Sequence, residues 1–174
     1  MKEYMVGAAL LVILSFVFCA TVDINRYLEQ NEMFDSCIED AANSASLYYD
    51  YSAYAEGKKV FLDNEAVRAV DEVLSGTYTL GASSDRYLNE AFNRYVTIYD
   101  DSLVKREYIN GVLQSSNNFT YGIQDTDRKG KKRDILSPTI IVYVDAGHPM
   151  MQLRYFRNRV TMTESAAYVY QTNF

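Results

Sequence analysis

Residue types that usually carry chemistry are scarce in this chain. Its 174 residues include no tryptophan, one histidine, two cysteines and two prolines. His148 stands in Gly147-His148-Pro149, where the expected role is that of a turn residue. No cysteine or acidic cluster accompanies it, as a zinc site would require. Zinc binding and histidine-based catalysis therefore both lack their usual partners.

The two cysteines are not expected to form a disulfide with each other. Cys19 and Cys37 lie eighteen positions apart on what the pattern below predicts to be one helix, so about 27 Å separates them. The fold is therefore expected to be stable without disulfides. Cys37 is either a buried residue of that helix, which we favour, or a contact to another molecule.

Motifs for catalysis, calcium binding and phosphate binding are also lacking. Ser102-Leu103-Val104-Lys105 matches the Ser-x-x-Lys pattern of penicillin-recognising enzymes, but the companion Lys-Thr-Gly element is absent, and we interpret Lys105 as helix surface. Asp100-Asp101 and Asp125-Thr126-Asp127 fit a cap and a turn, and neither has the oxygen spacing of a calcium loop. The sequence thus predicts no catalytic residue, no metal site and no cofactor.

The formal net charge of -6 argues against a nucleic-acid-binding protein. Five of the seventeen basic residues nevertheless fall within six positions, Arg128-Lys129-Gly130-Lys131-Lys132-Arg133. Between two predicted strands, this segment is either a solvated hairpin loop or a patch that binds an anion or a partner. An anionic surface polymer, a lipid headgroup or the acidic part of a neighbouring copy would be its natural target.

One long apolar run lies near the N-terminus. Met5 to Val22 is eighteen residues without a charge, and as a helix it reaches about 27 Å, close to the ~30 Å hydrocarbon core of a bilayer. We predict that residues 1–22 are a membrane anchor. A cleaved signal peptide is the alternative, but Phe18-Cys19-Ala20 places Phe where a cleavage site needs a small residue.

The anchor is expected to pack against partner membrane helices through its small residues, Gly7, Ala8, Ala9 and Ser15. Lys2 on one flank and Arg26 on the other leave the positive-inside rule undecided. The short head before the run favours a cell-membrane protein with a single pass and an extracytoplasmic C-terminal domain.

The helical pattern continues after Asp23, where the apolar run ends. Residues recur at alternating spacings of three and four, which indicates one stripe of an amphipathic helix outside the lipid. We predict that residues 23–51 form a helical stalk continuous with the anchor. Its stripe is expected to pack on the domain and on another subunit, and consists of Ile24, Tyr27, Asn31, Phe34, Ile38, Ala41, Ala45 and Tyr48.

Residues 52–174 are predicted to form one α+β domain, with helices first. Residues 63–76 begin with acidic residues and end at a glycine, which indicates a short helix with Val67, Val70 and Leu74 inward. Another helix is expected from residue 84 to 99, although 95–99 fits a strand equally. Residues 103–113 are a third helical candidate.

Strand-forming residues dominate the remainder of the domain. Phe119–Ile123, Thr139–Val144 and Arg159–Tyr170 are rich in β-branched and aromatic residues, with turn residues between them. Residues 151–156 are either a further strand or a connector. The predicted fold class is therefore α+β, with a long N-terminal helix, short helices and a C-terminal antiparallel sheet.

The two ends of the chain resemble TadE-like proteins, the pseudopilins of tight-adherence pilus systems. The resemblance lies in the apolar helix continuing into Ile24-Asn25-Arg26-Tyr27-Leu28, the alanine-rich residues 40–46, and the two last predicted strands around Pro149. The fifth residue after Gly7 is Val12, whereas prepilin-like proteins usually carry Glu there. The resemblance therefore implies an accessory envelope subunit and not a polymerising pilin.

We thus expect a non-enzymatic, membrane-anchored structural subunit of the minor pseudopilin type, in a pilus, secretion or conjugation apparatus. Its partners would be the membrane and other envelope subunits, contacted through the N-terminal helix. The alternative is an anchored binding or adhesion module in which residues 128–133 capture an anionic surface ligand.

Overall fold

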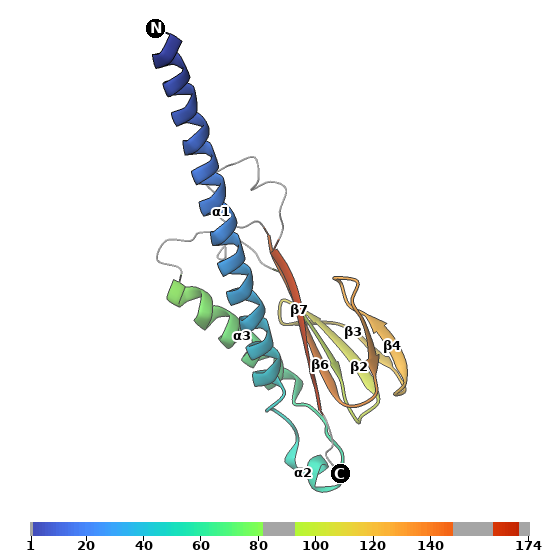
Figure 1. Ribbon diagram of the computed structural model, residues 1–174. Helices are drawn as coiled ribbons and strands as arrows, with labels where there is room; N and C mark the ends of the chain where they lie inside the picture. The colour runs from blue at the N-terminus through green and yellow to red at the C-terminus, as the bar shows by residue number, and fades with distance from the viewer. Residues whose placement is uncertain (1, 82–92, 148–161, 171–174) are drawn as a thin grey trace.

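The computed structural model describes residues 2–81, 93–147 and 162–170. Within these ranges, helices come first in the chain and an antiparallel sheet follows, as predicted (Figure 1). The helices are α1 (Lys2–Ala45), α2 (Tyr51–Ala55) and α3 (Asp63–Gly81). The strands are β1 (Asn93–Tyr99), β2 (Val104–Ile109), β3 (Val112–Asn118), β4 (Ile123–Thr126), β5 (Lys132–Ile135), β6 (Thr139–Gly147) and β7 (Met162–Val169).

Helix α1 runs without interruption through Asp23, where the apolar run ends. No proline lies within it, and at about 1.5 Å per residue its 44 residues extend about 66 Å. Its N-terminal half projects from the rest of the molecule, whereas its C-terminal half lies against α3 and β7 (Figure 1). A single helix across the predicted anchor and most of the predicted stalk is therefore confirmed.

The helix ends at Ala45, before the predicted boundary at residue 51. The amide of Ser46 is shared between two carbonyls of the preceding turn, each at 3.2 Å, which tightens the end of the helix. The prediction that Tyr48 belongs to the helix is therefore wrong. The chain turns instead, and the amide of Ser52 donates a 2.8 Å hydrogen bond to Asp50, which caps α2.

The main sheet has five antiparallel strands in the order β3-β2-β1-β6-β7, and β4 and β5 form a separate hairpin. Alternate residues of β6 face opposite sides of the sheet. Ile140 and Val142 pack with α1 and α3, whereas Ile141 packs with Ile135 of β5. The sheet therefore lies between a helical layer and the hairpin, and β3 and β7 are its two edges.

Three predicted elements are confirmed. β6 contains residues 139–144, β7 lies within residues 159–170, and α3 starts at Asp63 with Val67, Val70 and Leu74 buried. However, α3 continues through Gly76 to Gly81. A glycine ends a helix when it takes a left-handed conformation, and Gly76 does not have a positive φ.

The helix predicted at residues 103–113 is wrong, because this segment forms the β2–β3 hairpin. Asn110 and Gly111 have φ values of 50° and 82°, as a two-residue type I′ turn requires. An Asn-Gly pair supplies such a turn at little cost, and its twist matches that of the flanking strands. Lys105 consequently lies on strand β2 and not on a helix surface.

The strand alternative for residues 95–99 is confirmed, because β1 occupies Asn93–Tyr99 between β2 and β6. The strand predicted at 119–123 is wrong: a turn there includes Gly122 with a φ of 94°, and β4 starts only at Ile123. The other predictions for residues 84–92, for His148 and for residues 151–156 concern positions outside the described residues.

Candidate functional site

The apolar run forms the projecting half of α1. Along it, large side chains such as Leu11, Ile13 and Leu14 are exposed, with no layer of the fold covering them. By length and composition α1 can cross a membrane, a test that an N-terminal signal sequence also passes. Such a surface is stable in lipid and not in water, since burying apolar area contributes about 25 cal/mol per Å².

The small residues predicted to pack in the membrane, Gly7, Ala8, Ala9 and Ser15, all lie in this exposed segment. A Cβ built at Gly7 would meet no atom within 4 Å, so that position is open to a neighbouring helix. The hydroxyl of Ser15 donates a 2.8 Å hydrogen bond to the carbonyl of Leu11, which satisfies it inside its own helix.

The stalk stripe divides between two environments. Phe34, Ile38, Ala41 and Ala45 are buried in the core between α1, α3 and the sheet, and Cys37 is buried among them, as we favoured. Tyr27 and Asn31, nearer the apolar run, are half-buried. Ile24 is 57% exposed, and Leu28, one helical turn further along, is 52% exposed. An apolar surface therefore continues beyond the run without a partner in the described structure.

The basic segment lies at the tip of the β4–β5 hairpin. Asp127 closes the loop by accepting hydrogen bonds from the amides of Lys129 at 3.0 Å and Lys131 at 2.8 Å. Partial burial alone would raise the pKa of Asp127, but hydrogen bonds from the Ser165 hydroxyl and from these amides hold it below its usual value. The hydrogen bond between Asp127 and the Ser165 hydroxyl thus attaches the loop to β7.

Three of the five basic side chains make contacts within the protein, although Arg128 and Lys129 remain exposed. Arg128 lies 3.9 Å from the ring centroid of Tyr95, Lys129 pairs with Glu164, and Arg133 donates to the carbonyl of Ser165 at 3.2 Å. Lys131 and Lys132 are exposed and form no ion pair with a described residue. Of the five basic side chains in this loop, Lys131 and Lys132 are therefore the two without such a contact to a described residue.

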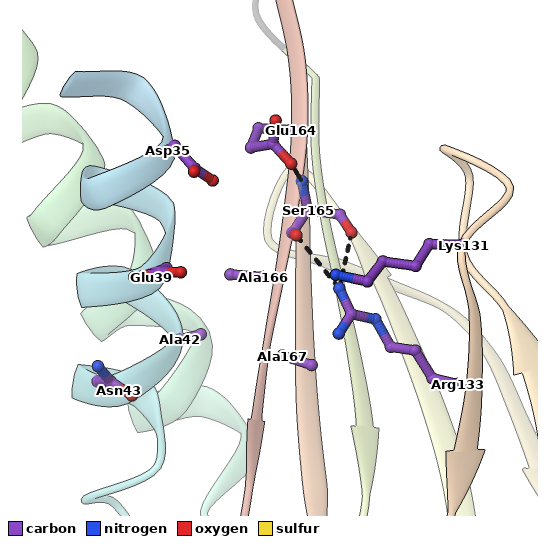
Figure 2. Close-up of a pocket in the computed structure, with 10 residues that line it drawn as sticks. All are labelled: Asp35, Glu39, Ala42, Asn43, Lys131, Arg133, Glu164, Ser165, Ala166 and Ala167. Atoms are coloured by element: carbon purple, nitrogen blue, oxygen red, sulfur yellow. Dashed lines mark hydrogen bonds between the residues drawn. The ribbon is translucent and has the colours of Figure 1, made fainter. Parts of the chain in front are cut away.

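A polar groove lies beside this loop, between α1 and the hairpin, with the edge strand β7 along its floor (Figure 2). Its volume is about 370 Å³. Figure 2 shows the side chains of Asp35 and Glu39 on the α1 side, and those of Lys131 and Arg133 reaching in from the hairpin. The complete lining is Asp35, Glu39, Ala42, Asn43, Lys131, Arg133, Glu164, Ser165, Ala166 and Ala167.

The outer edge of β7 faces this groove. The amide of Tyr170 donates to Pro138 just before β6, so even-numbered residues of β7 bond to β6 and the backbone groups of odd-numbered residues point outward. Ser165 is one of these, and side chains cap it: its amide donates to Glu164 at 3.0 Å and its carbonyl accepts from Arg133. Ala167 is the next, and no described side chain caps its backbone.

A buried ionic cluster that the sequence did not predict joins α3 to the sheet. Asp100 is fully buried and accepts hydrogen bonds from the amides of Phe61 at 3.0 Å and Ser102 at 3.1 Å, and from Arg106. Arg106 also lies 3.3 Å from Asp63 at the start of α3. Arg106 thus pairs with two carboxylates, and removing it would leave the charge of the fully buried Asp100 uncompensated.

A second unpredicted cluster surrounds Lys59, a buried residue that follows α2 in the chain. Figure 1 shows α2 at the end of the molecule opposite the projecting half of α1. The Lys59 ammonium lies 3.9 Å from the ring centroid of Tyr170, 5.0 Å from that of Tyr49 and 5.3 Å from that of Phe61. Burial lowers the pKa of Lys59. The aromatic rings belong to segments far apart in the sequence, so only the fold reveals the cluster.

Among the described residues, no three His, Cys, Asp or Glu side chains are grouped as a metal site requires. Comparison with known proteins matches the chain to no family model, no curated protein and no solved structure.

Proposed function

We propose that this protein is a non-enzymatic structural subunit, held in the membrane by a single helix, in a pilus, secretion or conjugation apparatus. The observation that carries the proposal is the division of α1: its first half is apolar and projects alone, and its second half is part of the domain core. A helix shared in this way fixes the domain at a set distance and angle from the bilayer.

The length of the shared helix supports this role. Between Asp23 and Ala45 it extends about 33 Å at 1.5 Å per residue, with no glycine or proline to act as a hinge. A tether for a free enzyme or receptor would need no such rigidity. An assembly subunit needs it, because neighbouring subunits must meet in register.

The resemblance of the chain ends to TadE-like pseudopilins points to the class of apparatus. The absence of Glu after Gly7 argues for an accessory role and a retained anchor. The exposed residues Ile24 and Leu28 extend the apolar surface beyond the run and offer a contact to the helix of another subunit.

Insertion into liposomes tests the anchor. Leu14→Arg, near the middle of the apolar run, is expected to cost about 2.5–3.5 kcal/mol of insertion free energy and to remove the full-length protein from floating liposomes. Leu28→Arg introduces the same charge outside the run and should leave flotation unchanged. Equal flotation of all three proteins would refute the anchor.

Cross-linking in cells tests the subunit role. A photoreactive residue at Ile24 should cross-link to a protein that has an apolar helix of its own, whereas one at exposed Lys58, far from the anchor, should not. Cross-links to lipid alone from Ile24 would contradict the subunit proposal while leaving the anchor intact.

The exposed pair Lys131 and Lys132 favours a second candidate, an anchored module that binds an anionic surface polymer. Replacing both by Ser leaves the internal contacts of Arg128, Lys129 and Arg133 in place. Loss of surface binding with unchanged Ile24 cross-linking would favour the module. Unchanged surface binding with loss of the Ile24 cross-link would favour the subunit.

A further inference from the structure

Along the groove, the outer edge of β7 is open at Ala167 and is covered at Ser165 by side chains. Four residues of β7, Glu164–Ala167, line the groove, which corresponds to about 13 Å of strand at 3.3 Å per residue. Ala167 presents its backbone amide and carbonyl, and Ser165 presents its own behind two side-chain hydrogen bonds. Ala166 and Ala167 have small side chains that pack on the two faces of the sheet, so neither side chain covers the outer edge of the strand.

The groove admits a chain of limited thickness. α1 stands at one side of β7 and the β4–β5 hairpin at the other (Figure 2). Lys129 of the hairpin loop also reaches the edge to pair with Glu164. A single extended peptide fits between these walls and can bond to β7 as an added strand, a mode in which main-chain hydrogen bonds supply affinity.

The walls carry opposite charges. On α1, Asp35 and Glu39 are exposed, one helical turn apart, and neither forms an ion pair with a described residue. On the hairpin, Lys131 is exposed and equally free. In an added strand, successive side chains point to opposite faces of the sheet. One set would therefore meet the carboxylates of α1 and the other would meet Lys131.

We propose that the β7 groove binds an extended segment of a partner protein as an added β-strand, with basic side chains toward α1 alternating with acidic side chains toward the hairpin. The groove includes no residue of the apolar run, so this inference does not depend on the anchor. It would provide the domain with a docking point separate from the helix.

A second copy of this chain is a poorer occupant. The other edge of the sheet, β3, has the sequence Val-Leu-Gln-Ser-Ser-Asn-Asn and contains no charged residue. Pairing β3 with β7 would leave Asp35, Glu39 and Lys131 without partners. Charge complementarity therefore selects a different protein.

Synthetic peptides test the groove on the full-length protein in detergent. A fluorescein-labelled peptide with a Lys-Glu-Lys-Glu-Lys-Glu core should bind, as measured by fluorescence anisotropy. A peptide of the same composition with a Lys-Lys-Lys-Glu-Glu-Glu core should bind at least about tenfold more weakly, because its charges cannot alternate between the walls. Equal binding of the two peptides would overturn the proposal.

Two variants separate main-chain from side-chain recognition. Ala167→Pro removes the outward amide N–H of residue 167. An edge strand tolerates proline at such a position, so the fold should be kept while peptide binding weakens at least about tenfold. Glu39→Lys should weaken binding about fivefold, whereas Asp40→Lys changes the charge of α1 equally at an exposed residue outside the groove and should have little effect.

Rescue and self-association complete the test. An alternative peptide in which Glu replaces the lysines should bind the Glu39→Lys variant better than it binds the original protein. Unchanged peptide binding by Ala167→Pro would overturn the added strand. Self-association in the absence of peptide, abolished by Ala167→Pro, would assign the edge to a second copy and also overturn the proposal.

Discussion

Replacing Arg106 by Met should strongly destabilise the domain. The side chain of Arg106 is 16% exposed and pairs with Asp100, whose carboxylate is 0% exposed, and with Asp63 at 3.3 Å. Removing one partner of a buried ion pair costs about 3–5 kcal/mol, because the other charge remains buried. Asp100 keeps its hydrogen bonds from the amides of Phe61 and Ser102, so we expect the lower end, about 3 kcal/mol.

The chain itself offers a matched control. Arg68 pairs with Glu72 at 3.2 Å on the surface of α3, with the two side chains 66% and 65% exposed. Arg68→Met should therefore cost about 0.5 kcal/mol or less. Urea unfolding of the full-length protein in detergent, followed by circular dichroism, would measure both losses. In a heat scan, the Tm of the Arg106→Met variant should be lower by about 6–12 °C, because each kcal/mol of lost stability lowers Tm by about 2–4 °C.

A double substitution shows whether the loss comes from the stranded charge. Arg106→Met with Asp100→Asn removes Arg106 together with the charge of its fully buried partner and leaves only the partly exposed Asp63, so it should be less unstable than Arg106→Met alone. Equal losses for Arg106→Met and Arg68→Met would refute the structural role of the cluster. If the double variant were no more stable than Arg106→Met alone, the uncompensated charge of Asp100 would be refuted as the cause of the lost stability.

Two further predictions concern turns. Gly111→Ala places a side chain at a φ of 82° in the β2–β3 turn and should cost about 1–2 kcal/mol in urea unfolding, whereas Gly76→Ala, within α3 and with no atom within 4 Å of the new Cβ, should stabilise by up to about 1 kcal/mol. A smaller loss of unfolding free energy for Gly111→Ala than for Gly76→Ala would contradict the left-handed turn at Gly111. Because the folded-state pKa of Asp127 is held below the ordinary 3.8, its contribution to stability is present above that pH and is lost as the pH falls through the folded value. The stability difference between the original protein and Asp127→Asn should therefore be greatest near neutral pH and shrink in acid, and a difference independent of pH would contradict this reasoning.

Regular periodicity made the longest elements predictable. The apolar run and the stripe through Phe34 and Ile38 predict one helix, and α1 is that helix. The β-branched residues of 139–144 predict a buried strand, and β6 is the strand between β1 and β7. In each case the local preference and the final burial agree, so no contact from elsewhere in the chain was needed to decide the element.

The errors lie where two local signals compete. Residues 103–113 contain apolar positions that fit a helix, but the Asn110-Gly111 pair favours a tight turn and the neighbouring strand β1 supplies hydrogen bonds to β2. At residues 95–99 the helical and strand patterns fit equally well. Pairing with β2 and β6 then decides for a strand, because a sheet satisfies backbone groups through residues distant in the sequence.

The amino-acid sequence by itself determined the apolar run, the continuous helix through Asp23, the basic segment at 128–133 and the scarcity of catalytic residues. These depend on composition and on spacing within one segment. Only the tertiary structure decided which basic residues remain free and that Asp35 and Glu39 face Lys131 across β7. The physical reason is that β7 becomes an edge, and the groove forms beside it, only after strands from distant parts of the chain have paired and α1 and the hairpin have packed on opposite faces of the sheet.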